Sequence, residues 1–209
     1  MCTIYFVFVD TISQHTMIQH LQLLPEKLKN KLNNINDETS RTKSLVGLMI
    51  VGKLLNDQRT GIDIHCLSYD RNGKPLLTNG HNISIAHSGN MVLCCYSAQG
   101  AVGLDVEALG YHIGPLYDEY LTPKELTALN TDRNPEVAFG KMWVRKEAVL
   151  KADGIGLLHP LNELDVTDDT VELRNNTYYL QDINITPDFV AALATTHPHN
   201  EAKPKEVTF

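Results

Sequence analysis

The sequence Gly103-Leu104-Asp105-Val106-Glu107 combines an apolar run with two carboxylates two positions apart. If this run forms a β-strand, alternate side chains share a face, so Asp105 and Glu107 lie on the same side. Two neighbouring like charges in a partly buried strand need a proton or a cation to compensate them. A divalent metal ion, which prefers oxygen ligands, would do this. The pair could instead lie on a solvent-facing edge of a sheet.

A second informative stretch has the sequence WVRKEAVLK and runs from Trp143 to Lys151. Trp143, Glu147 and Lys151 recur every four residues, and Gly154 follows where a left-handed C-terminal cap is expected, which predicts a helix. One helix face would then carry a third carboxylate and a lysine. With the first pair, these groups could bind a phosphate or pyrophosphate through Mg²⁺. Taken alone, Glu147 and Lys151 have the spacing of an ordinary surface ion pair.

The two stretches together resemble the paired signature of the 4'-phosphopantetheinyl transferases, in particular the surfactin-synthetase-activating (Sfp) type. Three shorter segments extend the resemblance over most of the chain, in the family's order: Ser44-Leu45-Val46-Gly47, Gly73-Lys74-Pro75 and Ala86-His87-Ser88-Gly89. The chain departs from the family at Ala86, where the family's Ser-His-Ser segment has its first serine. A hydroxyl contact at that position would be lost, whereas a backbone N–H contact would survive.

The resemblance implies a role for each matching residue. Asp105, Glu107 and Glu147 would bind Mg²⁺, or Mn²⁺ in its place. Glu147 would also remove the proton from the attacking hydroxyl, and Lys151 would stabilise the leaving phosphate. The donor substrate, coenzyme A, would be bound by a set of residues from the first half of the chain: Lys27, Lys31, Lys43, Ser44, Lys74, His87 and Ser88.

Several of these residues also have a purely structural explanation. The lysines of residues 27–31 can form the polar face of a helix, Lys74 can solvate a loop, and His87 can satisfy a buried hydrogen bond or cap a turn. Because the spacing from this cluster to Ser44 differs from the family's by about one residue, we favour Lys27 over Lys31 for the ribose phosphate.

The stretch Thr122-Pro123-Lys124-Glu125 has the form of a capping box with proline at the first helical position. In such a box the glutamate side chain reaches back to the N-cap backbone. We therefore expect Glu125 to serve the start of a helix rather than the chemistry.

The activity implied by the resemblance is transfer of the 4'-phosphopantetheine arm of coenzyme A to a serine of an apo acyl or peptidyl carrier protein, with release of 3',5'-ADP. Residues 108–121 would help to dock the carrier, and their aromatic and aliphatic side chains suit a protein contact: Tyr111, Ile113, Leu116, Tyr117 and Tyr120. Two alternatives remain open. One is a noncatalytic module that binds coenzyme A or a carrier, and the other is a metal-dependent phosphohydrolase that uses water.

Composition excludes several other classes of protein. The chain has 209 residues, 43% of them hydrophobic, which is enough for a sizeable core. A formal charge of -7 argues against a general nucleic-acid binder. No apolar run approaches the roughly 18 residues of a membrane span, and the N-terminus reads as a strand rather than a signal peptide. We expect a cytoplasmic monomer with four free, buried thiols: Cys2, Cys66, Cys94 and Cys95.

The periodicities predict an α+β fold. The first half contains strands at 3–9, 62–68 and 91–97, helices at 25–33 and 38–55, and a turn at 70–73. The second half contains a strand at 101–107, helices at 123–130 and 135–152, and strands near 164–166, 170–173, 177–181 and 190–194.

This repeated theme indicates an internal duplication, and the resembling family has such a pseudo-twofold architecture of two similar α/β lobes. We expect lobes at 1–100 and 101–196, with the metal site at their interface, because binding sites favour such crevices. The charged, proline-containing residues 197–209 are expected to form a flexible tail.

Overall fold

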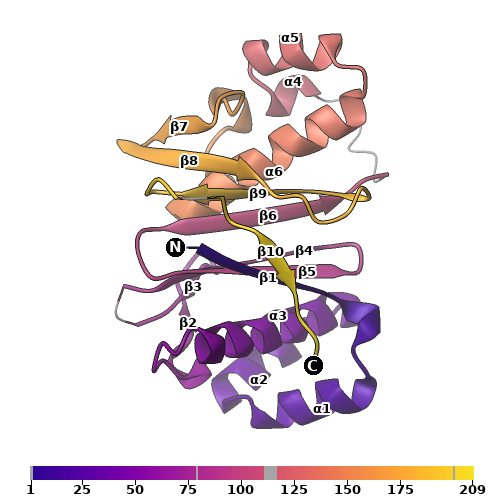
Figure 1. Ribbon diagram of the computed structural model, residues 1–209, viewed down its shortest axis with the longest axis vertical. Coiled ribbons are helices and arrows are strands. Elements are labelled where there is room, and N and C mark those ends of the chain that lie inside the picture. The colour runs from indigo at the N-terminus through magenta and orange to yellow at the C-terminus, as the bar shows by residue number, and fades with distance from the viewer. Residues whose placement is uncertain (1, 79, 111–116, 200) are drawn as a thin grey trace.

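The structure is a computed structural model that describes residues 2–78, 80–110, 117–199 and 201–209. Two β-sheets lie face to face at the centre, and helices cover the outer side of each (Figure 1). The predicted α+β class is therefore confirmed. In the described part of the chain, no helix combines the length and apolar character needed to cross a membrane.

The first lobe is built mainly from the N-terminal half of the chain. Its helices are α1 (Gln14–Leu23), α2 (Glu26–Asn33) and α3 (Glu38–Asp57). Its strands are β1 (Cys2–Phe8), β2 (Ser68–Tyr69), β3 (Pro75–Leu76), β4 (Asn82–Ser88), β5 (Met91–Ser97) and β10 (Pro204–Glu206), in the sheet order β10-β1-β5-β4-β3-β2. Asp37 caps α3 by accepting a hydrogen bond from Ser40 N, and buried leucine, valine and isoleucine side chains of this helix pack on the sheet.

The second lobe follows with β6 (Val102–Ala108), α4 (Tyr117–Tyr120), α5 (Pro123–Thr131) and α6 (Pro135–Asp153). The strands β7 (Thr170–Leu173), β8 (Asn176–Asp182) and β9 (Phe189–Thr195) complete an antiparallel sheet in the order β6-β9-β8-β7. Both helix-end predictions are confirmed, since Thr122 and Glu125 form the capping box of α5 and Gly154 ends α6 with a left-handed φ of 85°. Short 3-10 turns occupy Val9–Thr11, Ile64–Cys66, Gly156–Leu158 and Leu161–Glu163.

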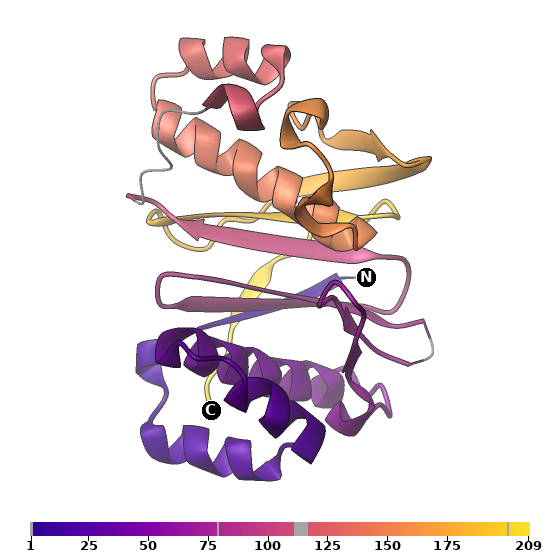
Figure 2. The same cartoon turned by 180° about the vertical axis from the view of Figure 1, so that it is seen from behind.

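The two faces of β6 serve different purposes. Val102, Leu104 and Val106 pack with side chains of β1, β5 and β9 in the core between the sheets. Gly103 and Asp105, which alternate with these residues, contact α6. Helix α6 lies on the side of β6 that faces away from the first lobe, as Figure 2 also shows. The predicted alternation along this strand is thus confirmed.

Serine hydroxyls join the two lobes along the free edge of β6. Leu104 N–H donates to Ser84 Oγ over 2.9 Å, and Ala108 N–H donates to Ser88 Oγ over 3.0 Å. Both serines belong to β4 of the first lobe, so their side chains satisfy backbone donors that would otherwise lack a strand partner. The lobes therefore meet through directed hydrogen bonds as well as apolar packing.

The prediction of a flexible tail after His197 is wrong. Strand β10 pairs in parallel with β1, Val207 N–H donates to Phe6 O, and the Val207 side chain is buried. The segment crosses from the second lobe back to the first (Figure 1). The segment has too few apolar residues to show the periodicity of a strand in the sequence. It forms a strand because it can pair with the edge of β1.

Other differences have local causes. Helix α1 was not predicted because none of its residues is buried, so it lacks a clear apolar stripe. The expected strand at 62–68 is largely a 3-10 turn capped by Asp63, whose side chain accepts from His65 N. No strand forms at 164–166, and Cys66 is exposed rather than buried. Strand β4 was not predicted, since only three of its seven side chains, Ile83, Ile85 and Ala86, are apolar.

The absence of a side chain at Gly103 lets α6 lie directly on β6. A Cβ atom there would stand 1.9 Å from Ala148 O and 2.5 Å from Ala152 N, both of them backbone atoms of α6. Glycine within a strand commonly marks such a close backbone approach. This contact places the end of the helix over Asp105.

We predict that Gly103→Ala destabilises the protein by roughly 1–3 kcal/mol, because the helix must shift to admit the methyl group. Thermal unfolding measures the effect. Gly52→Ala in α3 is the matched control, since its Cβ would meet nothing closer than 3.8 Å and alanine favours a helix by up to about 1 kcal/mol. Equal unfolding temperatures for the two variants would contradict the close approach.

Candidate active site at the junction of the two lobes

Asp105 and Lys151 form the centre of the candidate site. Lys151 Nζ lies 2.6 Å from Asp105 Oδ1, which joins β6 to the last turn of α6. Asp105 is 6% exposed, and its second oxygen, Oδ2, is buried without a hydrogen-bond partner in the described structure. A buried carboxylate oxygen without a partner is costly, and a cation at this position would offset that cost.

Glu107 is held by a residue of the other lobe. Ser88 Oγ donates to Glu107 Oε2 over 2.7 Å and at the same time accepts from Ala108 N–H. Ser88 was predicted to bind coenzyme A. Here its hydroxyl is engaged in orienting Glu107.

Glu147 lies on α6 one turn before Lys151, as the sequence pattern predicted. Burial raises the pKa of Glu147, and the charges of Asp105 and Glu107 raise it further, while Lys151 opposes both effects. The three carboxylates are therefore close enough to affect one another. Their mutual repulsion is the condition that a bound cation would relieve.

The other two carboxylates are perturbed in the same direction. Burial raises the pKa of Asp105 against the opposing ion pair with Lys151. Burial also raises the pKa of Glu107, with a smaller contribution from Asp105, whereas the hydrogen bond from Ser88 lowers it. The protein thus holds these acids together at an electrostatic cost.

The residues fit a hard divalent cation by charge and by donor type. Carboxylate oxygens are the ligands that Mg²⁺ prefers, and Asp105 Oδ2 is buried and uncommitted. By distance the fit is incomplete. Among the described residues, no group of three or more His, Cys, Asp or Glu side chains is close enough to hold an ion in this arrangement.

A cavity of about 250 Å³ opens beside Glu147 and Lys151 and is lined by both lobes. The turn at Gly73-Lys74-Pro75 forms one side of it. Lys74 Nζ donates to Ala152 O over 2.5 Å, and Asn72 Nδ2 donates to Gly154 O over 2.8 Å. The Lys74 ammonium, predicted to bind coenzyme A, therefore caps the carbonyl end of α6, and burial lowers its pKa.

A second cavity of about 210 Å³ lies within the first lobe and is lined by Lys31, Ser44, Tyr69 and His87, among others. Lys31 Nζ stands 3.3 Å from the centroid of the Tyr69 ring. The two cavities adjoin, because the same three residues line both of them: Gly73, Pro75 and Ile85. We refer to these two neighbouring cavities together as the cleft, and their linings include Lys31 at one end and Glu147 at the other.

His87 stands between the basic and acidic ends of this cleft. Partial burial of its ring lowers the pKa, as do the nearby charges of Lys43 and Lys151, and Glu107 opposes them. His87 as a residue is nevertheless exposed to solvent. Lys43 lies near His87, whereas Lys27 is exposed and lines neither cavity.

The aromatic segment expected to dock a carrier is only partly described. Tyr111, Ile113 and Leu116 lie outside the described residues. The rings of Tyr117 and Phe139 are 4.8 Å apart between centroids, and Tyr120 meets Trp143 edge-on at 5.4 Å. These two tyrosines therefore contribute to a small core with α6.

Several residues that shape the site were not predicted from the sequence. Gly103, Ser84 and Asn72 act through backbone contacts that depend on another lobe or element, so no local pattern reveals them. Lys146 was visible as part of the signature, but its burial was not foreseen.

The family model of the 4'-phosphopantetheinyl transferase superfamily matches residues 101–197, which include Asp105, Glu107, Glu147 and Lys151. The 4'-phosphopantetheinyl transferase Sfp of Bacillus subtilis (strain 168) is 22% identical over 93% of this chain and 92% of its own length. Over most of its length the chain is therefore similar to the 4'-phosphopantetheinyl transferases.

Further proteins match parts of the chain. The 4'-phosphopantetheinyl transferase HetI of Nostoc sp. is 30% identical over 47% of this chain and 45% of its own length. A solved structure, the holo-[acyl-carrier-protein] synthase of Thermotoga maritima, is 18% identical, covers 45% of this chain and 61% of its own, and has a TM-score of 0.36. That likeness is too slight to bear on the fold of this chain.

We predict that Glu147→Gln raises the unfolding temperature in metal-free buffer at neutral pH. A carboxyl whose pKa is raised by folding destabilises the folded state when it is charged, so the penalty is present above the folded pKa and is relieved as pH falls. The gain over the native protein should therefore shrink toward acidic pH. Thermal unfolding in EDTA across this pH range measures it.

Glu163→Gln is the control for that measurement, because Glu163 is exposed and carries the same charge. Its unfolding temperature should follow that of the native protein. A Glu147→Gln variant that is less stable than native at neutral pH would show that the acidic cluster is not under electrostatic strain.

Proposed function

We propose that the protein transfers the 4'-phosphopantetheine arm of coenzyme A to a serine hydroxyl of an apo acyl or peptidyl carrier protein, with Mg²⁺ as cofactor and 3',5'-ADP as product. The similarity to 4'-phosphopantetheinyl transferases supports the reaction class. The observation that carries the proposal is the meeting of Asp105, Glu107, Glu147 and Lys151 at one end of a cleft formed by both lobes.

The cleft suits a long, negatively charged donor. The nucleotide end of coenzyme A would enter the cavity lined by Lys31, Ser44 and His87, with Lys43 nearby to offset phosphate charge. The pyrophosphate would then reach the adjoining cavity at Glu147 and Lys151. Lys74 would contribute by holding the end of α6 in place.

The chemistry divides among the acidic residues and Lys151. Asp105, Glu107 and Glu147 would hold Mg²⁺, or Mn²⁺ in its place, and the bound ion offsets negative charge on pyrophosphate oxygens. Lys151 adds positive charge for the leaving phosphate. Glu147 would accept the proton of the serine hydroxyl, directly or through a water.

We further infer that the two lobes are related by a pseudo-twofold axis through an internal duplication. Each lobe places a shorter helix before a longer one, α2 before α3 and α5 before α6, against a sheet with antiparallel strands. We propose that the protein works as a cytoplasmic monomer on coenzyme A and carrier proteins. Its net charge of -7 supports the view that nucleic acid is not its partner.

Incubation of apo carrier protein with coenzyme A and Mg²⁺, followed by mass spectrometry, tests the activity. We expect the phosphopantetheine adduct with the native protein, and a rate about 10²–10⁴-fold lower with Glu147→Gln, as typical for loss of a general base. Binding of coenzyme A should change little. Unchanged transfer by this variant would remove Glu147 from the chemistry.

The same assay separates the alternatives. A noncatalytic module would bind coenzyme A without forming any adduct. A phosphohydrolase would cleave coenzyme A when the carrier is left out.

Lys31 and Lys27 provide a matched pair on α2 for testing the nucleotide site. We predict that Lys31→Met raises the KM for coenzyme A about 10-fold, a loss of about 1.4 kcal/mol of binding free energy, typical of a lost charged contact. Lys27→Met removes the same charge from a position that lines neither cavity and should leave KM unchanged. Steady-state kinetics with coenzyme A and with dephospho-coenzyme A, which lacks the 3'-phosphate, measure the difference.

If Lys31 binds the 3'-phosphate, the effect of its substitution disappears with dephospho-coenzyme A. Equal KM values for the two lysine variants with coenzyme A would contradict the assignment.

A further inference from the structure

A buried ion pair between Glu125 and Lys146 lies behind the candidate active site. Lys146 Nζ stands 2.6 Å from Glu125 Oε2, and the two side chains are 1% and 0% exposed. Neither residue lines the cleft described above. The pair joins α5 to α6, the helix that carries Glu147 and Lys151.

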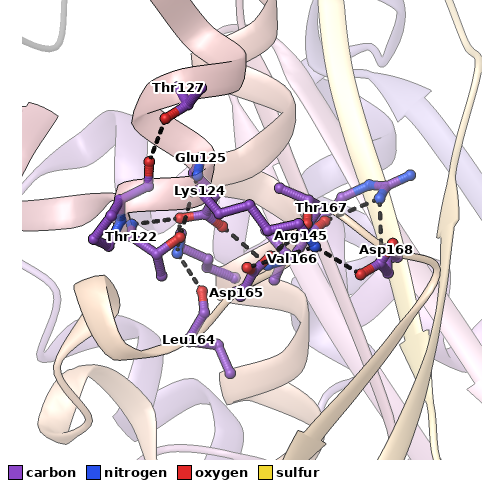
Figure 3. Close-up of polar contacts among 12 residues, drawn as sticks. Thr122, Lys124, Glu125, Thr127, Arg145, Leu164, Asp165, Val166, Thr167 and Asp168 are labelled. Atoms are coloured by element: carbon purple, nitrogen blue, oxygen red, sulfur yellow. Dashed lines mark hydrogen bonds and ion pairs between the residues drawn. The ribbon is translucent and has the colours of Figure 1, made fainter.

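The remaining hydrogen-bonding groups of this pair are satisfied by backbone. Glu125 Oε2 accepts from Thr122 N–H over 2.8 Å, and Glu125 Oε1 accepts from Val166 N–H over 2.9 Å. Lys146 donates to Leu161 O over 2.9 Å and also to Leu164 O. Figure 3 shows Glu125 between Thr122 and Val166, with Leu164 beside them. Residues 161–166 are thereby fastened to both helices.

Stability alone gives little reason to retain such a pair. Desolvating two charges is costly, and well-packed apolar residues are often as stable in the same place. An apolar pair would fill the space but would allow α6 to rotate or slide. Directed hydrogen bonds from Lys146 to fixed carbonyls fix the helix in one orientation.

The packing of α6 on β6 makes this orientation important. At Gly103 the helix backbone meets a strand position without a side chain, so interlocking side chains do not fix its rotation there. The side chains of Lys146 and Arg145 hold the helix laterally instead. The Arg145 guanidinium donates to Asp182 Oδ1 over 2.6 Å and to Val166 O over 3.1 Å. The Cα atoms of a helix lie about 2.3 Å from its axis and side-chain ends lie farther out, so a rotation of about 10° moves a carboxylate by about 1 Å.

We propose that the Glu125–Lys146 pair is a positioning device that sets the rotation of α6 and thereby holds Glu147 toward Asp105 and Glu107. Lys146 precedes Glu147 in the chain, so any rotation that the anchor prevents would displace the carboxylate directly. A displacement of about 1 Å at a reacting group can cost about 10²-fold in rate. The predicted loss of rate rests on the proposed transferase function, whereas the predicted displacement of the Glu147 carboxylate does not.

The first test is the neutral pair Glu125→Gln with Lys146→Met. Glutamine keeps an acceptor for a backbone N–H, and methionine keeps the length of the apolar stem. In the folded variant we expect kcat to fall about 10–100-fold, while the KM for coenzyme A stays within about twofold. Lys141→Met is the control, because it removes an exposed lysine from the same helix and should change neither parameter.

Two further readings do not depend on turnover. Mn²⁺ binding, followed by electron paramagnetic resonance, should weaken about 10-fold, as is typical when the support of a metal ligand is lost. Trp143 is the only tryptophan of the chain and lies one helical turn before Glu147, so its fluorescence emission and anisotropy report on α6. Both should change in the neutral pair and not in Lys141→Met.

A charge-preserving variant covers the case in which the neutral pair does not fold. Lys146→Arg keeps the positive charge but lengthens the side chain, so it should displace α6 and lower kcat and Mn²⁺ affinity. Adding Glu125→Asp shortens the partner side chain and should restore part of the kcat and part of the Mn²⁺ affinity. A folded Lys146→Arg or neutral-pair variant with native kcat, native Mn²⁺ affinity and native Trp143 emission would overturn the proposal.

Failure of the proposed function gives a different result. If the native protein transfers no phosphopantetheine, the proposed activity is wrong. Measurements of Mn²⁺ binding and of Trp143 fluorescence still decide whether the Glu125–Lys146 pair positions α6.

Discussion

The contact between α6 and β6 at Gly103 is the constraint on which the rest of the structure depends. Because no side chain separates the two backbones, Ala148 and Ala152 lie against the strand, and Lys151 reaches Asp105 with an ion-pair distance of 2.6 Å. The same approach brings Glu147 within the electrostatic influence of both strand carboxylates. The acidic cluster is therefore a consequence of helix-on-sheet packing, and the lobe that contains it needs precise support around α6.

The contacts that hold α6 and β6 in place come from both lobes. Ser84 and Ser88 of the first lobe satisfy the free edge of β6, while Asn72 and Lys74 cap the carbonyl end of α6. These contacts make the lobe interface structural and functional at once. Burial raises the pKa of each acid, and repulsion between the carboxylates raises those of Glu107 and Glu147 further, so the cluster is held together at an electrostatic cost.

Sequence patterns predicted the elements whose apolar periodicity is strong. The boundaries of β5 and β7 were predicted to the residue, and those of α6 to within one. Helix α1 and strand β10 were missed because they lack a buried stripe or a long pattern. Strand β4 was missed as well, although it lies inside the first sheet. At the site, the signature located Asp105, Glu107, Glu147 and Lys151, but Ser88 and Lys74 proved to have structural contacts that their neighbours in sequence did not indicate.

The sequence by itself determined which acidic and basic side chains share a face, because alternation along a strand and the four-residue recurrence along a helix fix this. It also determined the class of the fold through the same periodicities. Only the tertiary structure decided how the two faces meet, which lysine enters the first-lobe cavity, and why Glu125 and Lys146 are buried together. The reason is physical: these outcomes depend on contacts between segments distant in the chain, and local propensity carries no record of them.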